Sequence, residues 1–187
     1  MRYKIGVIGS AKCLQPDVLE KARRVGKEIA KQECILLTGG TTGVSYEAVK
    51  GAKEKNGFTI GFSPAANLVE HTNIYRLPTE CFDVLIYSGF GLKGRNVLLV
   101  RSCDAILAIS GQIGTLNEFT IAWDEQKIVG FLKGTGGICD DEGIKKFWRT
   151  CKNKDQREII LHHHPQKLVN LLIEKVEESE NQNRFKG

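Results

Sequence analysis

Short apolar runs that alternate with segments of helical periodicity constrain the fold of this chain more than any other feature. The apolar runs are too short for helices and are typical of strands buried on both faces; they lie at 5–9, 34–37, 58–62, 83–87, 104–109 and 128–132. Helices are expected between them, at 16–32, 44–55, 95–101 and from about 115 to 126. This alternation predicts an α/β domain with a mostly parallel central sheet covered by helices on both faces.

The chain shows no polar linker or shift in composition that would divide it. Residues 1–178 are therefore predicted to form a single domain, and residues 179–187 a polar, frayed tail. A helix near 141–150, a strand near 159–161 and a helix over 165–178 are expected in the C-terminal third. The run His162-His163-His164 precedes Pro165, and we interpret it as a helix boundary and not as a metal site.

The charge pattern and the cysteines narrow the range of partners and compartments. The formal net charge is +5, but basic and acidic residues alternate, which favours solvated helix faces over a nucleic-acid surface. The six cysteines form no C-x-x-C pair, so no zinc site is predicted, and Cys34 and Cys103 are expected in the core. The sequence shows no signal-peptide pattern and no long apolar stretch, so a cytosolic protein without a membrane partner is expected.

Two glycine-rich turns, residues 38–43 and 110–115, each follow a predicted strand and precede a predicted helix. A helix N-terminus offers unpaired N–H groups and a partial positive charge, and glycines let the backbone approach a ligand closely. Such a turn is therefore suited to binding phosphate. Because both turns belong at the carboxyl ends of parallel strands, we expect them to share one crevice.

The sequence contains neither a P-loop nor a G-x-G-x-x-G fingerprint. The two glycine-rich turns resemble those of a different family. The segment 38–43 (TGGTTG) resembles the GGGxxG turn of the LOG (lysine-decarboxylase-like) family in the SLOG Rossmann-like superfamily, and 110–118 (SGQIGTLNE) resembles its PGGxGTxxE motif. Gly9-Ser10 after the first strand and Arg95 also match. The chain is most similar to the branch that includes molybdenum-cofactor carrier proteins.

The resemblance implies a Rossmann-like fold, a homo-oligomer and a small phosphorylated ligand, with no cofactor required beyond a bound nucleotide or phosphate. It implies that Glu118 and Arg95 are catalytic residues of N-glycosidic bond hydrolysis in nucleoside 5′-monophosphates, and it does not imply lysine decarboxylation. The implied phosphate- and nucleotide-binding residues are Gly9, Ser10, Gly39, Gly40, Thr41, Gly43, Gly111, Gly114 and Thr115.

Several residues depart from the family pattern or have a purely structural interpretation. Ser110, Gln112 and Asn117 replace a proline, a glycine and an acid, which weakens the case for hydrolysis more than that for phosphate binding. Thr115 and Glu118 have the spacing of a capping box. Arg95 is compatible with a surface helix position, Gly39 and Gly40 with packing, and Ser10 with a turn cap.

Three functions therefore stay open: a phosphoribohydrolase, a non-catalytic carrier or sensor of a phosphorylated pterin-type cofactor, and an oligomeric scaffold. The apolar run 97–100 exceeds what one buried helix face needs, which predicts a helix-mediated dimer.

Overall fold

The computed structural model describes residues 1–151 and 159–184 and shows a sheet of seven parallel strands. The strands are β1 (Lys4–Gly9), β2 (Ile35–Thr38), β3 (Phe58–Ser63), β4 (Val84–Tyr87), β5 (Ala105–Ile109), β6 (Ile128–Leu132) and β7 (Ile160–His162). Their order in the sheet is β4-β3-β2-β1-β5-β6-β7, and each neighbouring pair is parallel. The predicted α/β, Rossmann-like sheet is confirmed.

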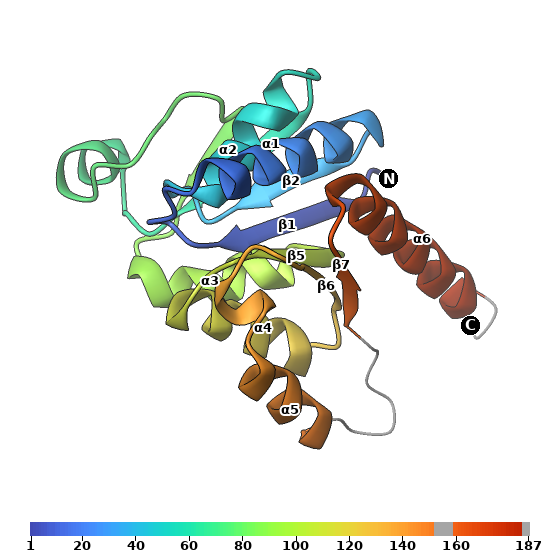
Figure 1. The fold of residues 1–187 in the computed structure, drawn as a ribbon. Helices are drawn as coiled ribbons and strands as arrows, with labels where there is room; N and C mark the ends of the chain where they lie inside the picture. The colour runs from blue at the N-terminus through green and yellow to red at the C-terminus, as the bar shows by residue number, and fades with distance from the viewer. Residues whose placement is uncertain (152–158, 185–187) are drawn as a thin grey trace.

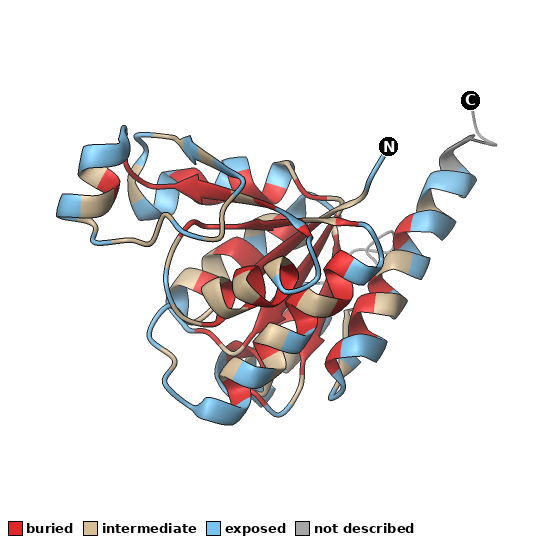
Figure 2. Ribbon diagram, turned by 90° about the horizontal axis from the view of Figure 1, so that it is seen from above, coloured by how far each residue is buried: buried red, intermediate tan, exposed pale blue. Residues whose placement is uncertain are grey.

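Six helices cover the two faces of this sheet and make the three layers visible in Figure 1. Helices α1 (Pro16–Lys31), α2 (Val44–Lys53) and α6 (Pro165–Arg184) pack on one face, where Ile5, Ile29 and Leu172 share an apolar cluster. Helices α3 (Gly91–Arg101), α4 (Ile113–Asp124) and α5 (Glu142–Thr150) lie on the other face, over a cluster that includes Phe119 and Trp148. Figure 2 shows buried strands between helices whose outer faces are exposed.

Glycines bring α1 and α2 close enough to share one face of the sheet. A Cβ atom on Gly26 would collide with the carbonyl of Ala48, and one on Gly51 would collide with the carbonyl of Arg23. The two helices therefore touch backbone to backbone, which places the N-terminus of α2 beside the turn after β1. The Val44 N–H donates to the carbonyl of Ser10 over 3.0 Å at that junction.

The C-terminal third differs from the prediction in the length of its last helix. Helix α6 begins at Pro165, directly after the histidine run, so the predicted boundary is confirmed. It continues to Arg184, beyond the expected end at 178, because residues 174–182 are mostly Glu, Lys and Gln, which favour helix and form pairs such as Lys175–Glu178. Residues 185–187 of the predicted tail lie outside the described residues.

Other expectations concern the core and the long loop after β3. Cys34 and Cys103 are buried as predicted, and burial raises the pKa of the Cys34 thiol to about 11, so it stays protonated at neutral pH.

The long loop after β3 contains a turn of π-helix, Glu70–Ile74, that the sequence pattern did not predict. Its His71 is fully buried and bonds to the Ser63 side chain over 2.8 Å, which ties the loop to the sheet.

The strand order places a topological switch point between β1 and β5. The chain runs outward from β1 to β4 and then returns to β5, which pairs with β1 up to the contact of Gly9 with Ile109. In open parallel sheets the crevice outside the carboxyl ends at such a point is the usual place for a ligand. The two glycine-rich turns lie at this edge, as predicted.

Candidate functional site

A cavity of about 170 Å³ opens at the switch point. Its walls come from the turns after β1 and β2, the first turn of α2 and the first two turns of α3 and α4. The residues that line it are Gly9, Ala11, Gly39, Thr41, Ser45, Leu92, Lys93, Arg95, Asn96, Gly114, Thr115 and Glu118. Segments far apart in the sequence thus meet in one small cavity.

A buried ion pair between α3 and α4 forms one side of the cavity. The Arg95 Nη1 donates to Glu118 Oε1 over 2.8 Å and to Asn96 Oδ1 over 2.8 Å. Arg95 is 5% exposed and Glu118 is 7% exposed. The Asn96 side-chain amide in turn donates to Asn117 Oδ1 over 2.7 Å, so the pair belongs to a network that links the two helices.

The Arg95 guanidinium also lies on the glycine-rich turn after β2. A Cβ atom on Gly39 would overlap three atoms of this guanidinium, so only glycine leaves room for it. Within the described part of the chain, the buried Arg95 Nε has no hydrogen-bond partner. An unpaired buried donor is costly, and it marks a position where an acceptor from a ligand would be stabilising.

The environment of Glu118 acts on its pKa in two directions. Burial raises the pKa of this carboxyl above its ordinary value, and the neighbouring Arg95 opposes that rise by stabilising the carboxylate. The charge of Lys93 acts in the same sense as that of Arg95. The ionised form of Glu118 is therefore stabilised mainly by its arginine partner.

Several features make the cavity attractive to an anion. Gly114 and Thr115 in the first turn of α4 line the cavity, and among the described residues no N-cap side chain accepts from this turn, so the N-terminus of α4 brings a partial positive charge to the cavity. The Lys93 Nζ lies near the first turn of α4, 3.4 Å from where a Cβ atom of Gly114 would be. Because the charges of Arg95 and Glu118 offset each other, Lys93 and the N-terminus of α4 leave the cavity with an excess of positive charge.

Comparisons with known proteins show the family of this chain. A family model described as the SLOG cluster4 family matches residues 2–169. The chain belongs to the SLOG cluster4 family. This confirms the resemblance to SLOG proteins drawn from the two glycine-rich turns.

The similar proteins share most of the chain's length. An uncharacterized protein of Archaeoglobus fulgidus is 35% identical over 144 residues, 77% of this chain and 87% of that protein. The molybdenum cofactor binding protein of Rippkaea orientalis superposes with a TM-score of 0.79 at 29% identity, covering 94% of this chain and 98% of that one. The molybdenum cofactor carrier protein of Chlamydomonas reinhardtii gives a TM-score of 0.74 at 28% identity, over 93% and 98% of the two chains.

The structure brings most of the predicted site residues together. Those that line the cavity are Gly9, Gly39, Thr41, Arg95, Gly114, Thr115 and Glu118, while Ser10, Gly40, Gly43 and Gly111 do not line it. Gly40 has a φ of +61° and lies against the backbone of Phe62 and Ser63, which matches the packing interpretation of this glycine, whereas Gly39 lines the cavity. The Ser10 hydroxyl accepts from the Lys12 N–H over 3.3 Å, as in a turn.

Two structural interpretations left open by the sequence are wrong. Helix α4 begins at Ile113 with Gln112 as its N-cap, so Thr115 lies inside the first turn and is not the N-cap of a capping box. The Glu118 side chain instead forms an ion pair with Arg95. Arg95 is likewise no surface residue, because α3 packs this side of the helix against the turn after β2.

Sequence reasoning missed Ala11, Ser45, Leu92, Lys93 and Asn96 as lining residues. Three of them flank Arg95 on α3, and the predicted helix began only at 95. A helix start at Gly91 would have placed Lys93 in its first turn.

The remaining predictions concern metals and membranes. Among residues 1–151 and 159–184, no group of histidine, cysteine or acidic side chains is arranged to hold a metal ion. No helix within the described ranges has the length and apolar character needed to cross a bilayer.

Proposed function

We propose that this protein binds a phosphorylated pterin-type cofactor at the cavity and carries it without hydrolysing it. The observation that carries the proposal is the buried Arg95–Glu118 pair, with 2.8 Å between Nη1 and Oε1. It leaves a cavity in which an anion meets Lys93 and the N-terminus of α4, while the carboxylate of Glu118 is neutralised by its partner.

The charges of the cavity suit a phosphate monoester. The phosphate would be placed at the first turn of α4, where Gly114 and Thr115 offer N–H groups and Lys93 offers an ammonium. Arg95 would complete the site with its unpaired Nε or with Nη2. The solved structures of molybdenum cofactor binding and carrier proteins, at 29% and 28% identity, support this type of ligand.

Hydrolysis of nucleoside 5′-monophosphates is the competing function, because Glu118 does line the cavity. An N-glycosidase needs a carboxylate that can orient or deprotonate water and stabilise an oxocarbenium-like sugar. Here Oε1 is held by Arg95, and the neighbouring acid of the family motif is Asn117, whose Oδ1 is held by Asn96. These contacts favour the carrier over the enzyme.

Titration calorimetry with inorganic phosphate, AMP, GMP and 6-hydroxymethylpterin monophosphate tests the proposal, with chromatography of the same mixtures for free base. We expect saturable binding of the phosphorylated compounds and no base release. Release of base by the wild type that is lost in Glu118→Gln would establish the hydrolase instead. If no compound binds, the scaffold interpretation replaces both.

The cytosolic location, the homo-oligomer and the absence of a nucleic-acid partner stay predictions. Sedimentation and a DNA-binding assay on the same preparation would test the last two.

A further inference from the structure

The cavity at the switch point is too small for a whole nucleotide or pterin cofactor. Its volume is about 170 Å³, whereas pockets that enclose small-molecule ligands have volumes of about 300–1,000 Å³. The cavity therefore suits the phosphate end of such a ligand. On the proposed function, the ring of the ligand needs a second binding surface.

A separate groove of about 400 Å³ lies across the first turn of α4. Gly114 and Thr115 line the cavity, while the flanking residues Ile113 and Leu116 line the groove. Since all four residues belong to the first turn of α4, the cavity and the groove adjoin the same turn, and a ligand whose phosphate sits at the N-terminus of α4 can extend into the groove.

Bare backbone contributes to one side of the groove. Gly111 and Gly137 have φ of +97° and +57°, and a Cβ atom on Gly137 would collide with the backbone of Gly111. The Ile138 N–H donates to the Gly111 carbonyl over 2.9 Å, which joins the turn after β5 to the loop after β6. The two glycine backbones therefore pack directly against each other at one side of the groove, which fixes the position of the loop after β6 against the turn after β5.

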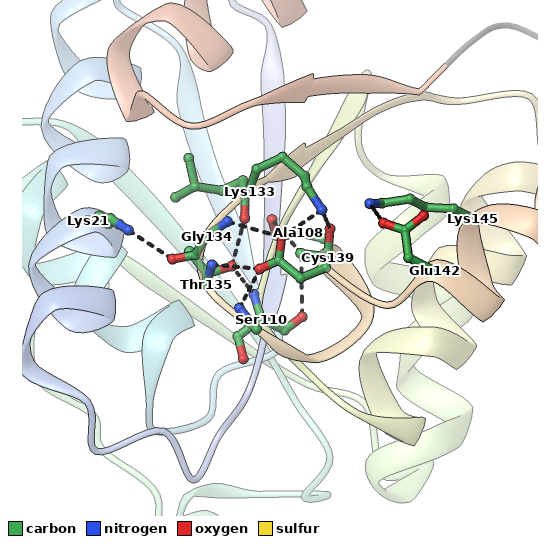
Figure 3. Close-up of polar contacts among 12 residues, drawn as sticks. Lys21, Ala108, Ser110, Lys133, Gly134, Thr135, Cys139, Glu142 and Lys145 are labelled. Carbon is green, nitrogen blue, oxygen red and sulfur yellow. Dashed lines mark hydrogen bonds and ion pairs between the residues drawn. The ribbon is translucent and has the colours of Figure 1, made fainter.

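Further hydrogen bonds hold the loop after β6 and the turn after β5 in place. The Ser110 N–H donates to the Thr135 hydroxyl over 2.8 Å, and that hydroxyl donates to the Leu132 carbonyl over 2.6 Å. The Cys139 thiol donates to the Ala108 carbonyl over 3.3 Å (Figure 3).

Most residues that line the groove are apolar or glycine, and its polar lining residues are Gln112 and the carboxylate Asp141. Ile113 is 74% exposed, so its side chain is accessible to a ligand in the groove. Asp141 is the N-cap of α5, and its Oδ1 accepts from the Ile144 N–H over 2.8 Å. In the part of the chain that the structure describes, Asp141 Oδ2 has no hydrogen bond or ion pair, so it can accept from a ligand.

We propose that this groove binds the ring of the phosphorylated ligand and that Asp141 selects a 2-amino-4-oxopyrimidine edge, the edge shared by guanine and pterins. That edge presents a ring N–H beside an amino group, two donors that a carboxylate accepts. Adenine presents an amino group beside a ring nitrogen lone pair, which the carboxylate repels.

Calorimetry with matched nucleotides tests this inference on the full chain. We expect GMP to bind about tenfold more tightly than AMP, the size of one lost hydrogen bond to a charged group. In Asp141→Asn the GMP affinity should fall to that of AMP, while the affinity for inorganic phosphate stays unchanged. Asparagine caps a helix as well as aspartate does, so the fold of α5 is kept. Asp124→Asn, at an exposed position at the end of α4, is the control and should keep the preference.

The outcomes separate this inference from the proposed function. If phosphate, GMP, AMP and the pterin monophosphate all fail to bind, the proposed function fails. If phosphate binds but GMP and AMP bind equally, or if Asp141→Asn keeps the preference, only the ring-groove inference is overturned. The monophosphate of 6-hydroxymethylpterin should bind at least as tightly as GMP and lose affinity in Asp141→Asn; binding of GMP alone would identify the ring as a nucleobase.

Discussion

The guanidinium of Arg95 lies against the backbone of Gly39, at a place where any side chain on residue 39 would overlap it. This contact joins α3, on one face of the sheet, to the turn after β2. It also directs the guanidinium toward Glu118, so a glycine in one motif determines where the arginine of another is held.

Gly39→Ala should displace Arg95 and weaken phosphate binding. We expect a loss of stability of about 1–3 kcal/mol, as for other overpacked positions. This corresponds to a fall in melting temperature of about 2–4 °C for each kcal/mol in a chain of this length. In the Arg95→Ala background the same alanine should cost little, because its steric partner is gone. An equal cost in both backgrounds would show that the glycine serves only its own turn.

Removal of Arg95 should lower the stability of the folded protein, because Glu118 loses its charged partner. Arg95→Met leaves a buried carboxylate unpaired, and we expect a loss of about 3–5 kcal/mol at neutral pH, measured by urea denaturation.

The same variant should have a distinctive pH dependence. Burial without a partner raises the pKa of Glu118 in the folded state, so the folded state binds more protons than the unfolded state. The free energy of unfolding should therefore fall as the pH rises from about 4.3, the unfolded pKa of glutamate, toward the raised folded value. The double variant Arg95→Met/Glu118→Gln should lack this component; the same pH profile in both variants would rule out Glu118 as its source.

Lys93 should contribute charge to anion binding with little effect on the fold. It is exposed on α3, and no ion pair is formed by its ammonium with another described residue. Lys93→Ala should reduce the affinity for inorganic phosphate by about 3- to 10-fold at low salt, with a smaller loss at high salt because exposed charges are screened. Lys55→Ala, at the opposite end of the sheet, is the matched control. Equal effects of the two variants would indicate a general charge effect only.

Asp140 should stabilise the loop that supports the groove. Burial raises the pKa of this carboxyl, but hydrogen bonds from Lys133 and from the N–H groups of Gly134, Thr135 and Gly136 outweigh that and hold the pKa well below its usual range. A lowered folded pKa gives stability that is present above about pH 3.9 and is lost as the pH falls below it. Asp140→Asn should cost about 1–3 kcal/mol at pH 7, and the difference from wild type should shrink in acid. A constant difference across pH would contradict this role.

The exposed apolar residues of α3 predict self-association. Val97 and Leu98 are 40% and 37% exposed, next to the buried Leu99 and Val100. Leu98→Glu should shift the sedimentation profile of a dimer or larger assembly toward monomer. Leu171→Glu, an equally exposed leucine on α6, should leave it unchanged. A wild-type protein that sediments as a monomer at micromolar concentration would exclude this interface.

The sequence by itself determined the elements and the edge of the sheet where the site lies. Apolar runs of strand length, Pro16 and Pro165 at helix starts, and glycines after strands are local signals, and the structure reproduces them. Because parallel strands place all their carboxyl ends together, local signals were enough to expect one shared crevice.

Only the tertiary structure decided which residues of the motifs face that crevice. Thr115 and Glu118 have capping-box spacing, but the helix begins at Ile113 and Glu118 finds Arg95 from a different helix. That pairing depends on how α3 and α4 pack, and on the absence of a side chain at Gly39, where the Arg95 guanidinium lies. No local pattern encodes either of these. The division of the ligand surface into a small cavity and a glycine-based groove likewise arises where the turn after β5 meets the loop after β6, two segments that adjoin only in the folded sheet.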